Sequence, residues 1–195
     1  MSYQPFTRDN AAMLLIDHQI GTMGWAKSMP FEELKRNALM LAKTAKILNI
    51  PVVLTSSMEE YAQGPLLAEL EALLPEAFAA RIKRLGIVNA MDDANFAAAV
   101  KATGRSKFII AGVTNDVCTV YPTLSLVHAG FDVQVVADAG ASPTRFADDI
   151  ALRRMESNGA TLTSTNQVIA ELTANWATPE GTQIVTEVVM PALQG

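Results

Sequence analysis

The fold is decided by the stretch Lys107-Phe-Ile-Ile-Ala-Gly-Val113, Thr114-Asn-Asp116, Val117-Cys-Thr-Val-Tyr121. Its first part is a continuous apolar run, which predicts a strand of a parallel sheet that is covered on both faces. The polar break at 114–116 ends that strand, and the following residues predict a helix from Asp116 to Ala129. Cys118 is the only cysteine among 195 residues, and it is therefore expected on a strand-to-helix turn.

A cysteine at the beginning of a helix is well placed to act as a nucleophile. Unpaired backbone N–H groups and the positive end of the helix dipole favour the thiolate over the thiol. The same N–H groups could also hold an oxyanion. The alternative interpretation is a small buried hydrophobic residue, which is the commoner role of a lone cysteine. The groups expected around Cys118 must decide between the two.

The rest of the chain alternates strands and helices. Apolar runs predict strands at 12–16, 51–55, 79–83, 107–113, 132–137 and 160–163. Helical periodicity and capping residues predict helices at 31–48, 66–74, 92–103, 116–129, 145–157 and 167–176. Connections of helical length imply parallel strands, so the fold class is α/β, with a parallel sheet covered on both faces.

The chain is expected to form a single domain over residues 1–195. Its core would span about 10–176, and Thr178-Pro-Glu-Gly-Thr182 would set off a C-terminal segment, 177–195, that packs on a neighbour or frays. The apolar run Ile184-Val-Thr-Glu-Val-Val-Met190 in that segment suits contacts between subunits.

Composition narrows the class of partner. The net charge of −5 argues against nucleic acid or an anionic membrane surface, so we expect a small-molecule substrate. A single cysteine cannot form an internal disulfide, which is typical of a reducing cytoplasm. The first residues lack the features of a signal peptide, and no apolar run approaches the ~20 residues of a membrane span. We therefore predict a cytoplasmic protein.

Two further groups are expected to meet Cys118 at one edge of the sheet, because ligands bind beyond the carboxyl ends of parallel strands. Asp17 directly follows the first strand and is the candidate base, although an acid there is often a cap or an ion-pair partner. Lys83 and Arg84 end the third strand. Alternation directs only one of these two cations into the crevice, and a solvated basic pair is the alternative.

Other chemistries have weaker support. His18 and His128 are the only histidines, and neither suits a Cys-His dyad: His18 would point away from Asp17, and His128 lies deep in the following helix. Two histidines without a second cysteine do not make an ordinary zinc site, and Gly21-Thr-Met-Gly24 lacks the further residues of a phosphate loop. We expect neither a metal nor a cofactor.

Four large side chains are expected near the crevice. They could line an apolar pocket, or they could belong to the core or to a subunit interface. These residues are Trp25, Met58, Met91 and Tyr121.

Three segments resemble the signature segments of the isochorismatase-like cysteine hydrolases. They are Leu14-Leu-Ile-Asp17-His-Gln19, Arg84-Leu-Gly-Ile-Val-Asn89-Ala90 and Ala111-Gly-Val-Thr-Asn-Asp-Val-Cys118-Thr-Val-Tyr-Pro122. Their order and spacing match from roughly Asn10 to Trp176. The chain is most similar to the YcaC-like branch of that family, whose substrate is not assigned.

This resemblance implies a three-layer α/β/α sandwich with a central six-stranded parallel sheet. It also implies that Asp17, Cys118 and a basic residue are catalytic. In the YcaC-like branch an arginine in the motif Arg-x-Gly-x-x-Asn-Ala replaces the usual lysine, which points to Arg84 rather than Lys83. Relatives form dimers to octamers, so a homo-oligomer is expected.

The resemblance also implies a non-proline cis peptide between Val113 and Thr114, which would direct the Thr114 N–H toward an oxyanion beside the N–H of Cys118. Asn115 departs from the family, in which a hydroxyl residue is usual. Thr55-Ser-Ser57 stands where relatives that deamidate nicotinamide carry metal-binding histidines, so that activity is disfavoured. The residues expected to bind substrate or oxyanion are Val113, Thr114, Gln19, Asn89 and Tyr121.

The sequence thus predicts a cysteine hydrolase of a small amide-like substrate, with Asp17 as base, Arg84 as electrostatic stabiliser and Cys118 as nucleophile. One alternative is hydrolysis of an isochorismate-type vinyl ether, which does not need the thiol. Another is a non-catalytic assembly or binding module on the same fold.

Overall fold

The computed structural model describes residues 4–194, and six parallel strands form its central sheet in the order β3-β2-β1-β4-β5-β6. The two middle strands are β1 (Ala11–Ile16) and β4 (Lys107–Gly112). On one side follow β2 (Val52–Ser57) and β3 (Ile82–Arg84), and on the other β5 (Asp132–Val136) and β6 (Thr161–Thr163). The predicted fold class is confirmed.

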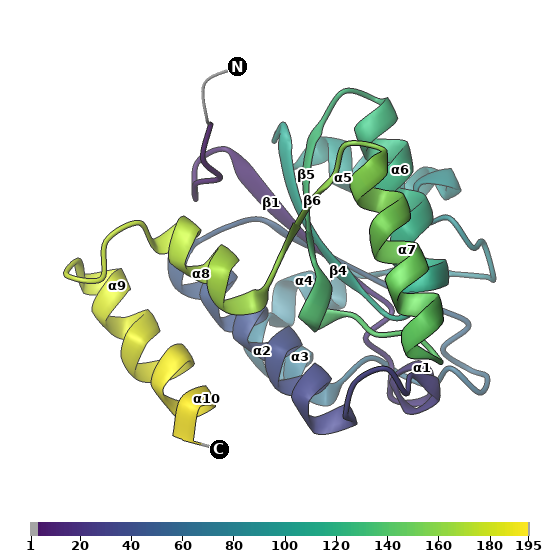
Figure 1. Cartoon of the computed structure of the whole chain (residues 1–195), viewed down its shortest axis with the longest axis horizontal. Coiled ribbons are helices and arrows are strands. Elements are labelled where there is room, and N and C mark those ends of the chain that lie inside the picture. Colours follow the sequence, from purple (N-terminus) through teal and green to yellow (C-terminus); the bar gives the residue numbers. More distant parts are fainter. Residues whose placement is uncertain (1–3, 195) are drawn as a thin grey trace.

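Helices cover both faces of this sheet, which gives three layers (Figure 1). One face carries α2 (Phe31–Leu48), α3 (Ala68–Leu73) and α8 (Thr165–Thr173). The opposite face carries α5 (Ala94–Ala102), α6 (Val120–His128) and α7 (Arg145–Ser157). Short elements connect them: α1 (Ile20–Trp25), α4 (Pro75–Ala79), and the 3₁₀ turns η1 (Ala90–Asp92) and η3 (Ala137–Ala139).

The middle strands are apolar throughout because both of their faces are buried. In β1, Met13 and Leu15 pack into the core beneath α2 and α8, whereas Leu14 and Ile16 pack into the core beneath α5, α6 and α7. Side chains alternate across a strand, so a strand covered on both sides shows no polar alternation. This explains why an unbroken apolar run was the right signal for a central strand.

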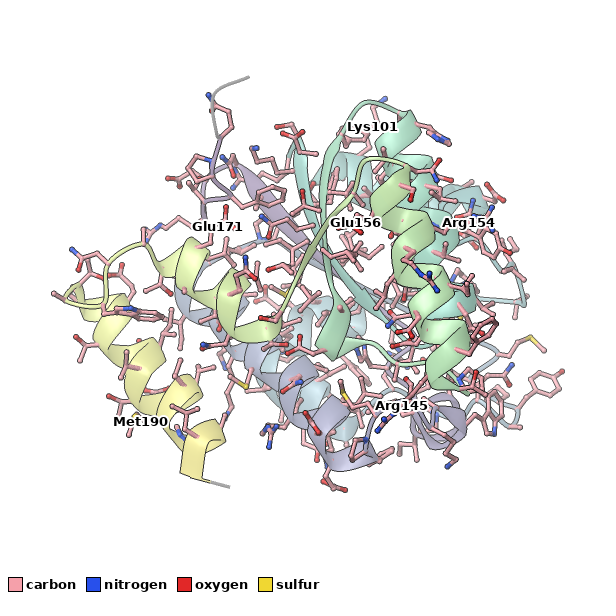
Figure 2. All side chains as sticks on the ribbon, in the orientation of Figure 1. Lys101, Arg145, Arg154, Glu156, Glu171 and Met190 are labelled. Atoms are coloured by element: carbon pink, nitrogen blue, oxygen red, sulfur yellow. The ribbon has the colours of Figure 1, made fainter. Side chains whose placement is uncertain are left out.

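The strand register brings the candidate residues to one edge. Ile16 pairs with Thr55 of β2 and with Gly112 of β4, and Arg84 at the end of β3 pairs with Ser57. The carboxyl ends of these four strands are therefore level with one another. They point toward the end of the molecule where α1 lies and where Arg145 begins α7 (Figure 2).

Two predicted elements differ in the structure. The third strand was expected at 79–83, but residues Pro75–Ala79 form the helix α4 and the strand occupies Ile82–Arg84. Proline is favourable in the first turn of a helix, and a three-residue edge strand has no periodicity to reveal it. The helix predicted from Asp116 instead begins as a π-helical turn, η2 (Asn115–Thr119), before α6 continues it.

The C-terminal segment packs on its own chain. It forms a helical stretch of α9 (Pro179–Ile184), the π turn η4 (Val185–Val189) and α10 (Met190–Gln194), which lies along α2 (Figure 1). Ile184 and Val188 are buried in the core beneath α2, whereas Met190 lies on the outer side (Figure 2). The described part of this segment therefore packs on its own chain rather than fraying, and the expected contact with a neighbouring subunit stays a prediction. Thr178 and Pro179 begin a helix, with the Thr178 hydroxyl accepting from the Gly181 N–H at 3.0 Å.

Within residues 4–194, no helix is both long enough and apolar enough to span a bilayer.

Candidate active site

Asp17 leaves the end of β1 in an unusual backbone conformation. Its φ of 56° is left-handed, which is uncommon for a residue other than glycine. The Asp17 N–H donates to the Thr55 carbonyl at 3.0 Å, so the neighbouring strand holds this conformation in place. The side chain is 1% exposed. The carboxylate is thus buried directly beyond the middle of the sheet.

Arg84 from the edge strand β3 is the cation that meets this carboxylate. Its Nη2 donates to both carboxylate oxygens of Asp17, and its side chain is also 1% exposed. Its Nε donates to the Thr55 hydroxyl at 3.0 Å, and its Nη1 donates to the Ile87 carbonyl at 2.6 Å. These contacts hold the guanidinium in one orientation, because its N–H groups form a rigid fork.

Lys83 points to the other side of the strand, as alternation requires. Its Nζ lies 2.8 Å from the Glu59 carboxylate, and its side chain is 52% exposed. Glu59 also binds Arg81, so these residues form an ion-pair cluster outside the site. The geometry therefore selects Arg84 over Lys83 as the partner of Asp17, in agreement with the family motif.

Cys118 lies in the π turn η2, and its thiol is hydrogen-bonded to the Asp17 carboxylate. Burial raises the pKa of the Cys118 thiol, and the negative charge of Asp17 beside it raises this pKa further. This differs from the expectation that a helix N-terminus would favour the thiolate. At rest, the sulfur keeps its proton.

Burial also raises the pKa of the Asp17 carboxyl, although the Arg84 charge acts in the opposite direction. A carboxylate whose pKa is raised is a better proton acceptor than an ordinary one. Asp17 and Cys118 thus share one proton next to a fixed positive charge. This arrangement suits transfer of the proton from sulfur to oxygen when a substrate arrives.

The expected oxyanion donors are only partly in place. The peptide bond between Val113 and Thr114 is cis. The Cys118 N–H donates to the Thr114 carbonyl at 2.8 Å, so it is already used within the π turn. The Thr114 backbone is hydrogen-bonded to the Cys118 sulfur, which opposes the rise in the pKa of that thiol, so the Thr114 N–H lies next to the reacting atom.

A cavity of about 340 Å³ opens beside this group. Asp17, Arg84, Thr114 and Cys118 all contribute to its wall. A volume of this size suits a small molecule rather than a polymer. The other lining residues are Thr22, Trp25, Ser57, Met58, Gln63, Gly86, Ile87, Val88, Asp116, Val117 and Pro143.

Four residues expected to bind substrate or oxyanion do not line this cavity. Gln19 is fully buried and bonds the backbone of Ser57 through both ends of its amide, at 2.9 and 2.8 Å. Asn89 caps η1 and donates to the Ser125 hydroxyl. Both amides satisfy neighbouring groups of the protein itself and lie outside the wall of this cavity.

The other two are Tyr121 and Val113. The Tyr121 ring, which is 37% exposed, lies beneath the guanidinium of Arg154, 5.5 Å from the ring centre. Val113 is fully buried in the core beneath α2. Of the large side chains expected near the crevice, Trp25 and Met58 do line the cavity, whereas Met91 packs in the core beneath α5.

Sequence reasoning missed three polar residues of the cavity wall: Thr22, Gln63 and Asp116. Asp116 lies two residues before Cys118, so its proximity to the nucleophile was a signal that could have been used. Thr22 and Gln63 follow no strand and belong to no motif. Only the packing of α1 against the loop at Gln63 brings them in, through the N–H groups of Gly21 and Thr22 that donate to the Gln63 carbonyl.

His18 is excluded as the base for Cys118. It is fully buried, does not line the cavity, and its Nε2–H donates to the Ala139 carbonyl at 2.9 Å. Burial lowers the pKa of His18 to about 4, with the Ala139 hydrogen bond acting in the opposite direction. The ring is therefore neutral at physiological pH. Within the described residues, no three His, Cys, Asp or Glu side chains are grouped as they would be to hold a metal ion.

Comparison with known proteins identifies the family. Residues 11–167 match the model of the Isochorismatase domain family. The probable hydrolase YcaC of Escherichia coli is 39% identical over 174 residues, which are 89% of this chain and 83% of that protein.

Two solved structures are similar over the whole chain. One is YcaC from Pseudomonas aeruginosa with hexane-2,5-diol and covalent acrylamide, with a TM-score of 0.92 and 37% identity over 100% of this chain and 96% of that one. The other is the E. coli protein, described as an octameric hydrolase of unknown specificity, with a TM-score of 0.92 and 36% identity over 100% and 95% of the two chains.

The fold and the site thus define an isochorismatase-like hydrolase. The chain belongs to the isochorismatase family, in the branch of YcaC.

The buried His18 predicts a pH dependence of stability. Because its pKa is lowered on folding, the unfolded chain binds a proton first as the pH falls, so the free energy of unfolding decreases between the ordinary value of 6.5 and about 4. The loss should reach about 3 kcal/mol at the lower end. Urea denaturation of the wild type and of His18→Gln over this range measures it. The free energy of unfolding should decrease less in the variant than in the wild type. An equal dependence on pH in the two proteins would contradict the assignment to His18.

Proposed function

We propose that the protein is a cysteine hydrolase that cleaves a C–N bond of a small amide-like substrate. The observation that carries this proposal is the contact between the Cys118 thiol and the Asp17 carboxylate, itself bound by Arg84, in the wall of one cavity. A nucleophile, a base and a group that orients the base are the parts that covalent catalysis requires.

The chemistry follows from these contacts. Asp17 takes the thiol proton as the sulfur attacks the carbonyl carbon, and the S–C bond forms. The C–N bond then breaks, and the leaving nitrogen takes the proton from Asp17. Water attacks the resulting thioester, gives a proton to Asp17, and releases the acid and the thiolate. Proton return from Asp17 to Cys118 completes the cycle.

Arg84 and Thr114 support these steps without forming bonds to carbon. The Arg84 charge stabilises the negative charge whether it resides on Asp17 or on the sulfur. The Thr114 N–H supplies a hydrogen bond to the oxyanion that develops during attack. Substrate size is limited by the cavity of about 340 Å³. The structure of P. aeruginosa YcaC holds covalent acrylamide, which is a small, uncharged amide, and this is consistent with the proposed class of ligand.

Mass spectrometry of the intact protein tests the mechanism. During turnover of small amides, carbamates and imides, the wild type should carry an acyl group that Cys118→Ala lacks, and release of the amine should fall roughly a thousandfold or more in Cys118→Ala and Asp17→Asn. Lys83→Met is the matched control, because Lys83 lies next to Arg84 and outside the cavity.

Two results would contradict the mechanism. Turnover that Cys118→Ala retains would favour hydrolysis of a vinyl ether without the thiol. A sulfur inert to substrates and alkylating agents would favour a binding or assembly module.

We also propose that the protein is a cytoplasmic homo-oligomer. The single free cysteine is consistent with a reducing compartment. Large apolar side chains are exposed near the site, including Leu85 at 86% and Phe146 at 76%, and surfaces of this kind are typical of subunit interfaces. The E. coli relative is octameric, which supports assembly of this chain.

Light scattering on the purified protein tests this assembly. The measured mass should be at least twice the 20.9 kDa of one chain. Leu85→Glu or Phe146→Glu should lower this mass, because a charge in an apolar interface is unfavourable. Tyr61→Glu serves as a control at another exposed aromatic residue. A monomeric wild type at micromolar concentration would contradict the proposal.

A further inference from the structure

The wall of the cavity carries more acidic than basic side chains. Its charged residues are Asp17, Arg84 and Asp116, so the only cation among the lining residues is Arg84. The N–H groups of that guanidinium are directed to Asp17, to the Thr55 hydroxyl and to the Ile87 carbonyl. It therefore neutralises the negative charge that Asp17 and Cys118 share, and it is not free to bind an anionic group of a substrate.

Asp116 is left without a counter-ion. No Lys, Arg or His of residues 4–194 forms an ion pair with it, and its Oδ1 is buried without a hydrogen-bond partner there. Its backbone N–H donates to the Ser142 hydroxyl at 3.3 Å, which fixes the residue in the wall. Asp148 lies close enough for the Asp116 charge to act on it, and this adds negative rather than positive potential.

A second polar group of the wall also lacks a partner. Thr22 is 5% exposed, and its hydroxyl is buried without a hydrogen bond inside the described part of the chain. A hydroxyl both donates and accepts, whereas an ionised carboxylate only accepts. Much of the remaining wall is apolar, with Trp25, Met58 and Ile87 among its residues. The wall of the cavity thus combines a carboxylate that lacks a counter-ion with an apolar surface.

We propose that this cavity selects uncharged or cationic amides that carry N–H donors, and that the carboxylate of Asp116 is the residue that rejects anionic substrates. This inference rests on the proposed function, because it assumes that the substrate reacts at Cys118. An amide N–H can donate to the Asp116 carboxylate, and a small apolar body fits the remaining wall. A dicarboxylate such as isochorismate would place negative charge beside Asp116 with no cation to receive it.

Two alkylating agents that differ in one charge test the inference. Iodoacetamide and iodoacetate both form an S–C bond at Cys118 with loss of iodide, and the protein has no other cysteine, so the intact mass reports the site. The ratio of the iodoacetamide rate to the iodoacetate rate is compared with that of N-acetylcysteine. In the wild type this ratio should exceed the reference by about tenfold or more, as expected for one unpaired charge in the wall of the same partly buried cavity.

Substitutions assign the effect to one residue. Asp116→Asn should lower the ratio about tenfold by accelerating iodoacetate, and Asp116→Glu should preserve it. Asp149→Asn is the matched control, because this acid is exposed and does not line the cavity; it should leave the ratio unchanged. A wild-type ratio equal to that of N-acetylcysteine, or a ratio that Asp116→Asn leaves unchanged, overturns the inference.

The same experiment separates the two proposals. If iodoacetamide reacts with Cys118 but the ratio of the two rates equals that of N-acetylcysteine, the inference is wrong and the proposed nucleophile stands. If neither reagent reacts with the folded protein, both proposals are overturned.

Discussion

The site depends on the buried pair of Asp17 and Arg84. Each side chain is 1% exposed, and an ion removed from water loses several kcal/mol of hydration that its surroundings must replace. Here the two carboxylate oxygens, the Thr55 hydroxyl and the Ile87 carbonyl receive the guanidinium N–H groups. The pair is stable only while β1, β2 and β3 keep their register. In turn, the contact between Arg84 and Asp17 anchors the short edge strand β3 to the end of β1.

This pair also sets the state of the nucleophile. A thiol beside a buried carboxylate holds its proton, so Cys118 is a weaker nucleophile at rest than a cysteine at an ordinary helix N-terminus. The π turn that carries the sulfur uses the Cys118 N–H for its own hydrogen bond. The helix terminus therefore positions the sulfur, and the activation of the sulfur comes from Asp17. Reactivity is thereby coupled to the arrival of a substrate that can accept the attack.

The sequence predicted the sheet well because each central strand is buried on both faces and is therefore apolar throughout. It also predicted that Asp17, Cys118 and one of two adjacent cations would meet, because the carboxyl ends of parallel strands lie at one edge. The short strand β3, the π turn and the C-terminal helix were missed. The position of β3 follows from Pro75, which begins the helix α4 just before it. The π turn forms because the Thr114 carbonyl accepts from several N–H groups, and the C-terminal helix is held by burial of Ile184 beneath α2.

Polar residues near the motifs were the least predictable. Gln19 and Asn89 were expected to contact substrate, but they satisfy groups within the protein; Thr22 and Asp116 line the cavity instead. Which polar side chain is already bonded is a property of the packed structure, and the order of residues does not reveal it.

The pKa of Cys118 tests most directly whether Asp17 governs the thiol. A single cysteine gives one resonance when the protein is labelled with carbon-13 at the cysteine β-carbon, and its titration can be followed in the wild type and in Asp17→Asn. In the wild type the resonance should titrate well above the ordinary value of about 8.5, and in Asp17→Asn the midpoint should fall. A midpoint at or below the ordinary value in the wild type, or one that Asp17→Asn does not move, would contradict the coupling between carboxylate and sulfur.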